Sequence, residues 1–339
     1  MIRFENDYTR GMHPRILERL VATNDEQTPG YGVDDHCDKA ASLIKNMCNR
    51  PDADVHFIVG GTLTNLTIIS SILRPHEAVI APVTGHVAVA ETGAIEATGH
   101  KVITIPTTNG KINAEQVRAV LETPDNVHAP RPGMIFISQS TELGGVYTKS
   151  EMIDLKAVAS EFDIPLFVDG ARLGYALAAP DCDVTFADMA AICDIFYIGG
   201  TKVGTMFGEA VVIINERLKR DFRYLMKQRG ALMAKGRLLG LQFEELFMDG
   251  LYEEVSKHAL SMARKVTEVL NEVGINLAYP APTNQLFIEF SEEQFATLSQ
   301  KYVLAPWSKS PGIVVARFCT DWSTRIEDVE MFIDDLKKL

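Results

Sequence analysis

The chain has 339 residues, of which 46% are hydrophobic and 23% are charged, as in ordinary globular proteins. It contains 33 Lys and Arg and 45 Asp and Glu, which gives a formal charge of −12. This acidic balance argues against nucleic acid as a partner, because phosphate binding requires clustered cations. The longest apolar runs, such as residues 210–214, are far shorter than the roughly 20 residues of a membrane span, so we expect no membrane segment.

The N-terminus and the cysteines predict a cytoplasmic protein. Residues 1–7 already contain acidic side chains, and they do not show the basic segment followed by an apolar segment that is typical of a secretory leader. The cysteines are odd in number, lie far apart and form no C-x-x-C pair, so we expect reduced and mostly buried thiols. They are Cys37, Cys48, Cys182, Cys193 and Cys319.

From residue 54 to about residue 215, short β-rich runs alternate with helical stretches. Strands are expected at 55–59, 78–81, 102–105, 134–138, 165–169, 194–198 and 210–214. A helix is expected over 86–97, and two others have capping pairs, Asn113 with Gln116 and Thr148 with Glu151. This alternation predicts an α/β fold with a mainly parallel sheet covered on both faces. Ligands then bind at the carboxyl ends of the strands.

After residue 215 the pattern changes to long helices that end at Gly274, followed by a small α+β region. That region contains expected strands at 285–290 and 312–318 and a last helix from Ile326. We therefore predict a large domain over residues 1–240 and a small C-terminal domain over residues 241–339.

Three loop clusters, each at the carboxyl end of a predicted strand, are candidates for chemistry. The first is Gly60-Gly61-Thr62, where glycines and free amides at a helix start can bind phosphate. It contains neither a Walker motif nor G-x-G-x-x-G, and a simple tight turn is an equal alternative.

The second cluster is Asp169 with Arg172, after an apolar strand; a partly buried carboxylate there needs a cation or proton donor, although a helix N-cap is also possible. The third is Lys202, in a glycine-rich apolar loop where desolvation favours a neutral, nucleophilic amine; a snorkelling structural lysine is the alternative. Together, a phosphate anchor, a carboxylate and an amine nucleophile are the set that pyridoxal 5'-phosphate requires.

These motifs, with others along the chain, resemble the threonine aldolase and β-eliminating lyase group of fold type I pyridoxal-phosphate enzymes. The phosphate loop of that group is usually Ser-Gly-Thr, so Gly60 stands where a serine is common. The matching segments are Asn6-Asp7, Gly30-Tyr31-Gly32, Gly60-Gly61-Thr62 with Asn65, His86 with Glu91, Asp169 with Arg172, Lys202 and Arg317.

The resemblance implies an aspartate-aminotransferase-like large domain, with a mainly parallel sheet of the seven-stranded type, and a small C-terminal α+β domain. It makes Lys202 the Schiff-base lysine and places His86 on the pyridine ring. The expected cofactor-binding residues are Gly60, Gly61, Thr62, His86, Asp169, Arg172, Thr201 and Lys202. The expected substrate-binding residues are Asn6, Tyr31, Arg172 and Arg317.

The implied activity is that of an aldehyde-lyase of the low-specificity L-threonine aldolase type. Such an enzyme cleaves the Cα–Cβ bond of a small β-hydroxy-α-amino acid to glycine and an aldehyde. The family also implies a homo-oligomer, a dimer or a homotetramer, with sites at the subunit interface. Lys235 or Arg237 is the candidate for a basic residue that enters the neighbouring phosphate site.

The sequence departs from the group at Thr141-Glu142-Leu143, where many of these aldolases have Thr-His-Asn. Glu142 is then a catalytic candidate that accepts the substrate hydroxyl proton directly or through water, and His86 acting through water is the alternative catalytic base. Two alternative functions stay open: a pyridoxal-phosphate-dependent β-eliminating lyase that yields an α-keto acid and ammonia, and a non-catalytic ligand sensor.

Metal-capable residue types also occur together over Asp34–Asp38. Adjacent positions on a helix point in different directions, so we expect a solvated helix start and no metal site.

Overall fold

The computed structural model describes residues 1–124, 126–280 and 282–339. Its main feature is a seven-stranded sheet with the order β2-β8-β7-β6-β5-β3-β4. The strands are β2 (Asp54–Ile58), β3 (Glu77–Pro82), β4 (Val102–Ile105), β5 (Arg131–Ser138), β6 (Leu166–Asp169), β7 (Ile195–Gly199) and β8 (Glu209–Ile213). Within this sheet β8 alone is antiparallel to its neighbours, β2 and β7. The predicted mainly parallel α/β sheet is therefore confirmed.

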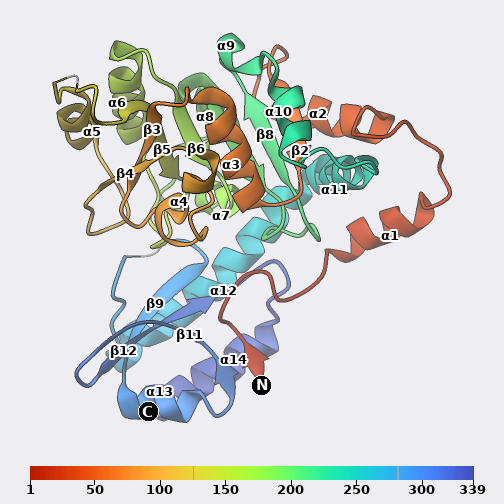
Figure 1. The fold of residues 1–339 in the computed structure, drawn as a ribbon. Coiled ribbons are helices and arrows are strands. Elements are labelled where there is room, and N and C mark those ends of the chain that lie inside the picture. Colours follow the sequence, from red (N-terminus) through yellow and green to blue (C-terminus); the bar gives the residue numbers. More distant parts are fainter. Residues whose placement is uncertain (125, 281) are drawn as a thin grey trace.

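Helices cover both faces of this sheet (Figure 1). One face packs against α2 (Asp35–Met47), α5 (Ala114–Leu121), α6 (Lys149–Glu161), α8 (Phe186–Ile192) and α11 (Arg237–Phe247). The other face packs against α3 (Gly61–Ile72) and α10 (Phe222–Gln228). The shorter or peripheral helices are α1 (Pro14–Ala22), α4 (His86–Val89), α7 (Leu173–Leu177) and α9 (Glu216–Lys219).

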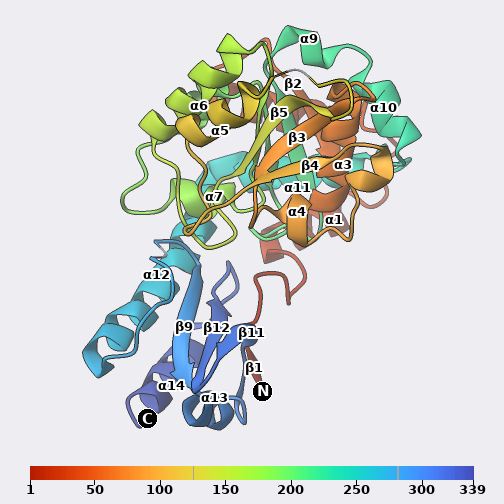
Figure 2. The ribbon, with the colours of Figure 1, turned by 60° about the vertical axis from the view of Figure 1, so that its left-hand side comes forward.

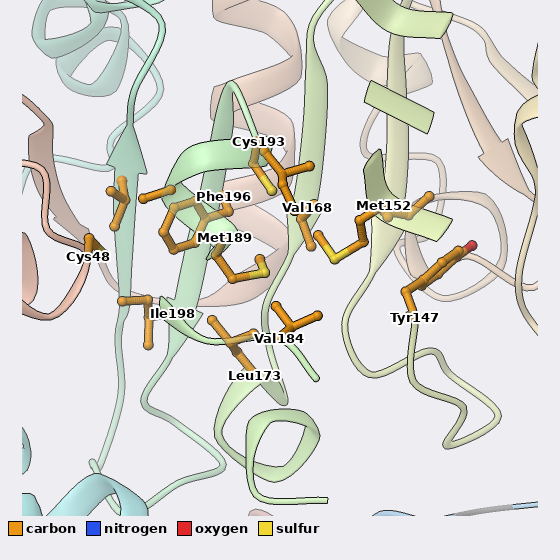
Figure 3. Close-up of a cluster of buried hydrophobic side chains, with 14 of the residues drawn as sticks. Cys48, Tyr147, Met152, Val168, Leu173, Val184, Met189, Cys193, Phe196 and Ile198 are labelled. Carbon is orange, nitrogen blue, oxygen red and sulfur yellow. The ribbon is translucent and has the colours of Figure 1, made fainter. Parts of the chain in front are cut away.

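Alternate residues of each central strand enter different apolar clusters. On β7, Phe196 and Ile198 belong to one cluster, and Tyr197 belongs to the cluster on the opposite face. Figure 3 shows Phe196 beside Met189 of α8 and Val168 of β6. Because these strands are buried on both faces, their sequences are continuously apolar. The densely packed sheet is a rigid base for the loops at its carboxyl edge.

The capping pairs are confirmed, but the helix expected over residues 86–97 is shorter. Both Asn113 and Thr148 cap their helices in reciprocal capping boxes. In contrast, α4 stops at Val89, and a separate 3-10 turn follows at Glu96–Thr98. The reason is local: Thr92 has φ +53° and Gly93 has φ +72°, values outside the right-handed helical region.

The start of α2 is only in part the solvated surface that we expected: Asp35 and Asp38 are exposed, and the other three residues of the segment are not. Asp34 caps the helix by accepting from the amides of His36 and Cys37, and all three residues are buried. The His36 ring bridges two carboxylates: its Nδ1 lies 2.5 Å from Glu244 Oε2, and its Nε2 lies 2.8 Å from Glu26 Oε2. Among the described residues, no group of three or more His, Cys, Asp or Glu side chains is arranged to hold a metal ion.

The C-terminal part has its own sheet, with the order β11-β12-β9 and antiparallel pairing. Its strands are β9 (Gln285–Ser291), β11 (Ala305–Ser310) and β12 (Ile313–Cys319), and its helices are α13 (Glu292–Leu298) and α14 (Ile326–Leu336). The N-terminal strand β1 (Ile2–Arg3) pairs with β10 (Tyr302–Val303) of this part. The N-terminal strand therefore packs with the C-terminal part of the chain.

A long helix, α12 (Leu251–Val273), joins the two parts (Figures 1 and 2). It ends where expected, because Gly274 takes a left-handed conformation with φ +74°. The division at residue 240 stays a prediction: that residue lies within α11, which packs against α1 and α2, so a division within α12 agrees better with the contacts. In the described part of the chain, no helix is long and apolar enough to cross a membrane.

A close backbone approach at the ends of β6 and β7 gives a stability prediction. A Cβ on Gly170 would lie 1.8 Å from the Tyr197 carbonyl oxygen. The Gly199 amide also donates to the Gly170 carbonyl at 2.9 Å, which keeps the two segments together. Gly170→Ala should lower the free energy of unfolding by about 1–3 kcal/mol or more, because backbone atoms cannot move aside.

The measurement is the thermal midpoint Tm of this variant and of Gly11→Ala, a control in which the new Cβ meets no atom within 4 Å. A Gly170→Ala protein as stable as the control would contradict the packing described here.

Candidate active site

The carboxyl ends of the central strands surround a cavity of about 300 Å³. The segments that follow β2, β5, β6 and β7 all contribute to its wall. The predicted site residues that line it are Gly60, Gly61, Thr62, His86, Glu142, Asp169, Arg172, Thr201 and Lys202. The three loop clusters, which are far apart in the sequence, therefore meet in one place.

Gly60-Gly61-Thr62 forms the start of α3 after β2. Gly60 is the N-cap residue, in extended conformation, and no side chain caps the helix. The first amides of a helix lack intrahelical acceptors, and the helix dipole favours negative charge there. This part of the cavity wall is therefore suited to an anion such as a phosphate group.

Asn65 on α3 connects two buried carboxylates. Its Nδ2 donates to Asp169 Oδ2 at 3.0 Å and to Glu91 Oε1 at 2.8 Å. Glu91 Oε1 also lies 2.8 Å from His86 Nδ1, and Asp169 Oδ1 accepts from the Ala171 amide at 2.9 Å. A carboxylate accepts hydrogen bonds, so His86 Nδ1 is the donor. These contacts fix the imidazole ring relative to the Asp169 carboxylate.

Glu142 faces the same cavity with one oxygen held in place. Its Oε1 accepts from Ser138 Oγ at 2.7 Å and from the His86 amide at 2.8 Å. Its Oε2 is buried and has no hydrogen-bond partner among the described residues. Burial, with the nearby charge of Asp169, raises the pKa of Glu142. The site thus contains a carboxyl group whose pKa is closer to neutrality than that of an ordinary glutamate, with one oxygen available to a ligand.

Lys202 lies in the loop between β7 and β8. Burial lowers the pKa of its amine, and the guanidinium of Arg172 lowers it further. The carboxylates of Asp7, Asp169 and Glu209 act in the opposite direction without reversing the shift. A lysine amine with a lowered pKa is more often neutral and can attack a carbonyl carbon.

Arg172 is held by Asp7, which is fully buried. Its Nε and Nη2 donate to the two Asp7 oxygens at 2.7 Å and 3.0 Å, and Asn284 Nδ2 donates to Asp7 Oδ2 at 2.9 Å. Burial alone would raise the pKa of Asp7, but the charges of Arg172 and Lys202 and these hydrogen bonds hold that pKa below its usual range. This carboxylate ties the N-terminal segment, the large sheet and the C-terminal part together.

The other proposed substrate-binding residues are not among those that line the cavity. Asn6 Oδ1 accepts from the Tyr8 amide at 2.9 Å, and Arg317 Nη2 donates to the Glu5 carbonyl at 2.9 Å. Tyr31 borders a separate small cavity, with its ring centroid 4.3 Å from Lys227 Nζ. The structure therefore does not bring Tyr31 to the cavity of its own chain, and the roles of these residues stay predictions.

Sequence reasoning missed Glu209, the first residue of β8. Its carboxylate is buried against the lysine loop: Oε1 accepts from Thr201 Oγ1 at 3.0 Å, and Oε2 accepts from the Gly200 amide at 3.2 Å. The available signal was a lone charge between a glycine-rich loop and the apolar run 210–214. In a strand with one exposed face, a charged residue can point to solvent. This strand is buried throughout, so a charged residue at its start is unusual.

The buried Asp7–Arg172 pair predicts an acid-sensitive contribution to stability. Because the pKa of Asp7 in the folded protein lies below the ordinary 3.8, its contribution is present above about pH 4 and is lost as the pH falls through the folded-state pKa. Asp7→Asn should lower the free energy of unfolding by about 3–5 kcal/mol at neutral pH, because Arg172 loses its counter-charge.

Denaturant unfolding at several pH values checks this. The deficit of Asp7→Asn should shrink below pH 4, whereas Asp163→Asn, which removes an exposed pair with Arg217, should change stability by at most about 1 kcal/mol. A deficit that is independent of pH would rule out this role for Asp7.

Comparisons with known proteins agree with the geometry. The family model described as beta-eliminating lyase matches residues 8–293. A low specificity L-threonine aldolase from Pseudomonas sp. (strain NCIMB 10558) is 30% identical over 339 residues, which cover 99% of this chain and 97% of that protein. A low specificity L-threonine aldolase from Pseudomonas aeruginosa is 29% identical over 339 residues, which cover 99% of this chain and 97% of that protein.

Solved structures extend the comparison. A threonine aldolase of known structure from Leishmania major is 47% identical to this chain in sequence. The two structures match with a TM-score of 0.98 over 100% of this chain and 99% of that one. An aspartate aminotransferase from Thermus thermophilus is 16% identical with a TM-score of 0.74, covering 100% and 91% of the two chains, which shows a shared fold. The chain therefore has the aspartate-aminotransferase-like fold, and it belongs to the beta-eliminating lyase family.

Proposed function

We propose that this protein is a pyridoxal-phosphate-dependent lyase that cleaves the Cα–Cβ bond of a threonine-like β-hydroxy-α-amino acid to glycine and an aldehyde. The observation that carries the proposal is the meeting of Lys202, Asp169 and the Gly60-Gly61-Thr62 helix start in one cavity. The similarity to threonine aldolases over nearly the whole chain supports the same reaction class.

The residues present fit the cofactor. The helix start at Gly60-Gly61-Thr62 would hold the phosphate, and Asp169 would pair with the protonated pyridine nitrogen. Thr201 is the other expected cofactor contact, and its hydroxyl, which donates to Glu209 in this structure, would have to turn toward the phosphate. Lys202 would bind the aldehyde carbon through its amine. Asn65 Oδ1 is buried without a partner among the described residues, as is Glu142 Oε2, so the site has polar atoms available for a ligand.

The bound cofactor supplies an electron-accepting ring for the electrons of the breaking bond. The protein residues orient the substrate and move its protons. Arg172 and Arg317, with Asn6, would bind the substrate carboxylate; Asp7 holds Nε and Nη2 of Arg172, which leaves Nη1 for this contact. Glu142 would take the proton from the substrate β-hydroxyl at Oε2, directly or through a water molecule. Its raised pKa brings it nearer to the pH at which a general base is most efficient.

We also propose a homo-oligomer, a dimer or a homotetramer, with sites at the subunit interface. The exposed apolar side chains of Tyr31, Val33 and Tyr224 support the presence of a subunit interface on the large part of the protein. In the proposed oligomer, Lys235 or Arg237 enters the phosphate site of the neighbouring subunit. Within its own chain, Arg237 Nη2 donates to the Asn24 carbonyl at 3.4 Å.

A cytoplasmic location is a further proposal. The cysteines of this chain are free, and of the five only Cys182 is not buried, which fits a reducing compartment.

Lys202→Ala tests the proposal. The variant should lose turnover of threonine and the visible absorbance that pyridoxal phosphate gives with the wild-type protein, because no other amine lines the described cavity. Lys101→Ala, at an exposed position, is the matched control. Enzyme assays and visible spectra of both variants provide the readouts, and a Lys202→Ala protein that kept both properties would disprove the assignment.

Product analysis separates the reaction from β-elimination. Wild-type protein with threonine should yield glycine and acetaldehyde in equal amounts. An α-keto acid and ammonia in their place would indicate the β-eliminating alternative, and no turnover of any β-hydroxy amino acid would favour a ligand sensor.

Glu142→Gln tests the general base. The substitution should lower kcat for threonine cleavage by about 10²–10⁴-fold, the usual contribution of such a group. Exchange of the α-proton of glycine should change little, because glycine has no β-hydroxyl. In the wild type, kcat/KM for threonine should fall on the acid side at a pH above 4.5, the ordinary glutamate pKa, since the base must be ionised. Equal losses in cleavage and exchange would contradict this role.

A further inference from the structure

Glu209 stands between the two segments that would hold the two ends of the cofactor. On one side its register partner is Ile58 of β2, two residues before the Gly60 helix start. On the other side its partner is Gly199 of β7, three residues before Lys202. Its side chain is among those that line the cavity. No part of the mechanism proposed above uses this carboxylate.

Hydrogen bonds fix both oxygens of Glu209 against the lysine loop. Thr201 Oγ1 donates to Oε1 at 3.0 Å and in turn accepts from the Gly208 amide at 3.0 Å. The Gly200 amide, at 3.2 Å from Oε2, also donates to the Gly208 carbonyl at 3.0 Å. The carboxylate thus closes the base of the loop that carries Lys202.

The charge balance around this group depends on one cation. The titratable groups that face Glu209 are Lys202 from the loop, Asp169 from β6, Tyr197 from β7 and Tyr252 from α12. Of these only Lys202 can be positive. The other cation that lines the cavity, Arg172, is committed to Asp7 through two hydrogen bonds.

An anionic ligand changes this balance. A phosphate group at the Gly60-Gly61-Thr62 helix start would add negative charge beside a site that already holds the carboxylates of Asp169 and Glu209. Both oxygens of Asp169 accept hydrogen bonds, one from the Asn65 side chain and one from the Ala171 amide. Glu209 has weaker compensation, since its donors are one hydroxyl and one shared amide.

We propose that Glu209 is a positioning residue that also exchanges a proton with solvent: its carboxylate balances the ammonium form of Lys202 in the empty cavity, and it becomes a neutral carboxylic acid when a phosphate-bearing ligand binds. Glu209 gains one proton at one carboxyl oxygen. Separately, Lys202 would give up its ammonium proton, and one water molecule would leave, when its amine joins an aldehyde carbon. The two proton changes are counted apart, because only the first requires the Glu209 carboxyl group. This inference rests on the proposed function, because pyridoxal phosphate is such a ligand. In agreement with it, burial raises the pKa of Glu209, and the charge of Lys202 opposes the rise.

The test is the number of protons that the full-length, cofactor-free protein takes up when it binds pyridoxal phosphate. Titration calorimetry at pH 8 in two buffers with different ionisation enthalpies measures this number. The wild type should take up as much as about one proton more than Glu209→Gln. Its affinity should accordingly fall with rising pH by up to about tenfold per pH unit more steeply than that of the variant.

Two further variants separate proton exchange from loop positioning. Glu209→Asp retains a carboxyl group but is too short to keep both hydrogen bonds, so it should retain most of the proton uptake with weaker binding. Glu245→Gln, which removes a buried carboxylate paired with Arg15 outside the cavity, should behave as the wild type. Circular dichroism of each variant checks that it is folded.

The outcomes are distinct. If the wild type binds pyridoxal phosphate and Glu209→Gln takes up the same number of protons, this inference is wrong and the proposed function stands. If the wild type gives no binding heat and no visible absorbance with pyridoxal phosphate, the proposed function fails, and the inference fails with it. Proton uptake that is lost in Glu209→Gln and kept in Glu209→Asp would support the role of the carboxyl group.

Discussion

An amine buried among carboxylates is the feature on which the site depends. Taking a charged ammonium group out of water is costly, and the cost is reduced either by nearby negative charge or by loss of the proton. Around Lys202 both occur: burial and Arg172 favour the neutral amine, and Asp7, Asp169 and Glu209 favour the cation. The net effect is a lowered pKa, so this amine loses its proton more readily than an ordinary lysine, as a nucleophilic lysine must.

Much of the fold could be predicted because its causes are local. The central strands, such as Leu166–Asp169 and Ile195–Gly199, are buried on both faces, so their apolar runs were visible in the sequence. Capping at Asn113 and Thr148 depends on partners three residues away and could be recognised directly. The convergence of three loops followed from the rule that parallel strands end at one edge of a sheet.

The features that were missed depend on residues distant in the sequence or on backbone geometry. His36 is buried because Glu244, 208 positions away, faces it from α11, and no local pattern shows this. The helix after His86 stops early because Thr92 takes a left-handed conformation, which its residue type does not announce. Glu209 was overlooked because its importance comes from contacts with the lysine loop, seen only when β7 and β8 are paired.

We propose that the Lys202 amine forms the covalent bond to pyridoxal phosphate. Borohydride reduction of the protein with bound cofactor converts that linkage to a stable amine, and mass spectrometry of the digested protein then locates it. We expect the pyridoxyl group on the peptide that contains Lys202. A pyridoxyl group on another lysine, such as the surface residue Lys227, with Lys202 unmodified, would show that Lys202 is not the residue that binds the cofactor.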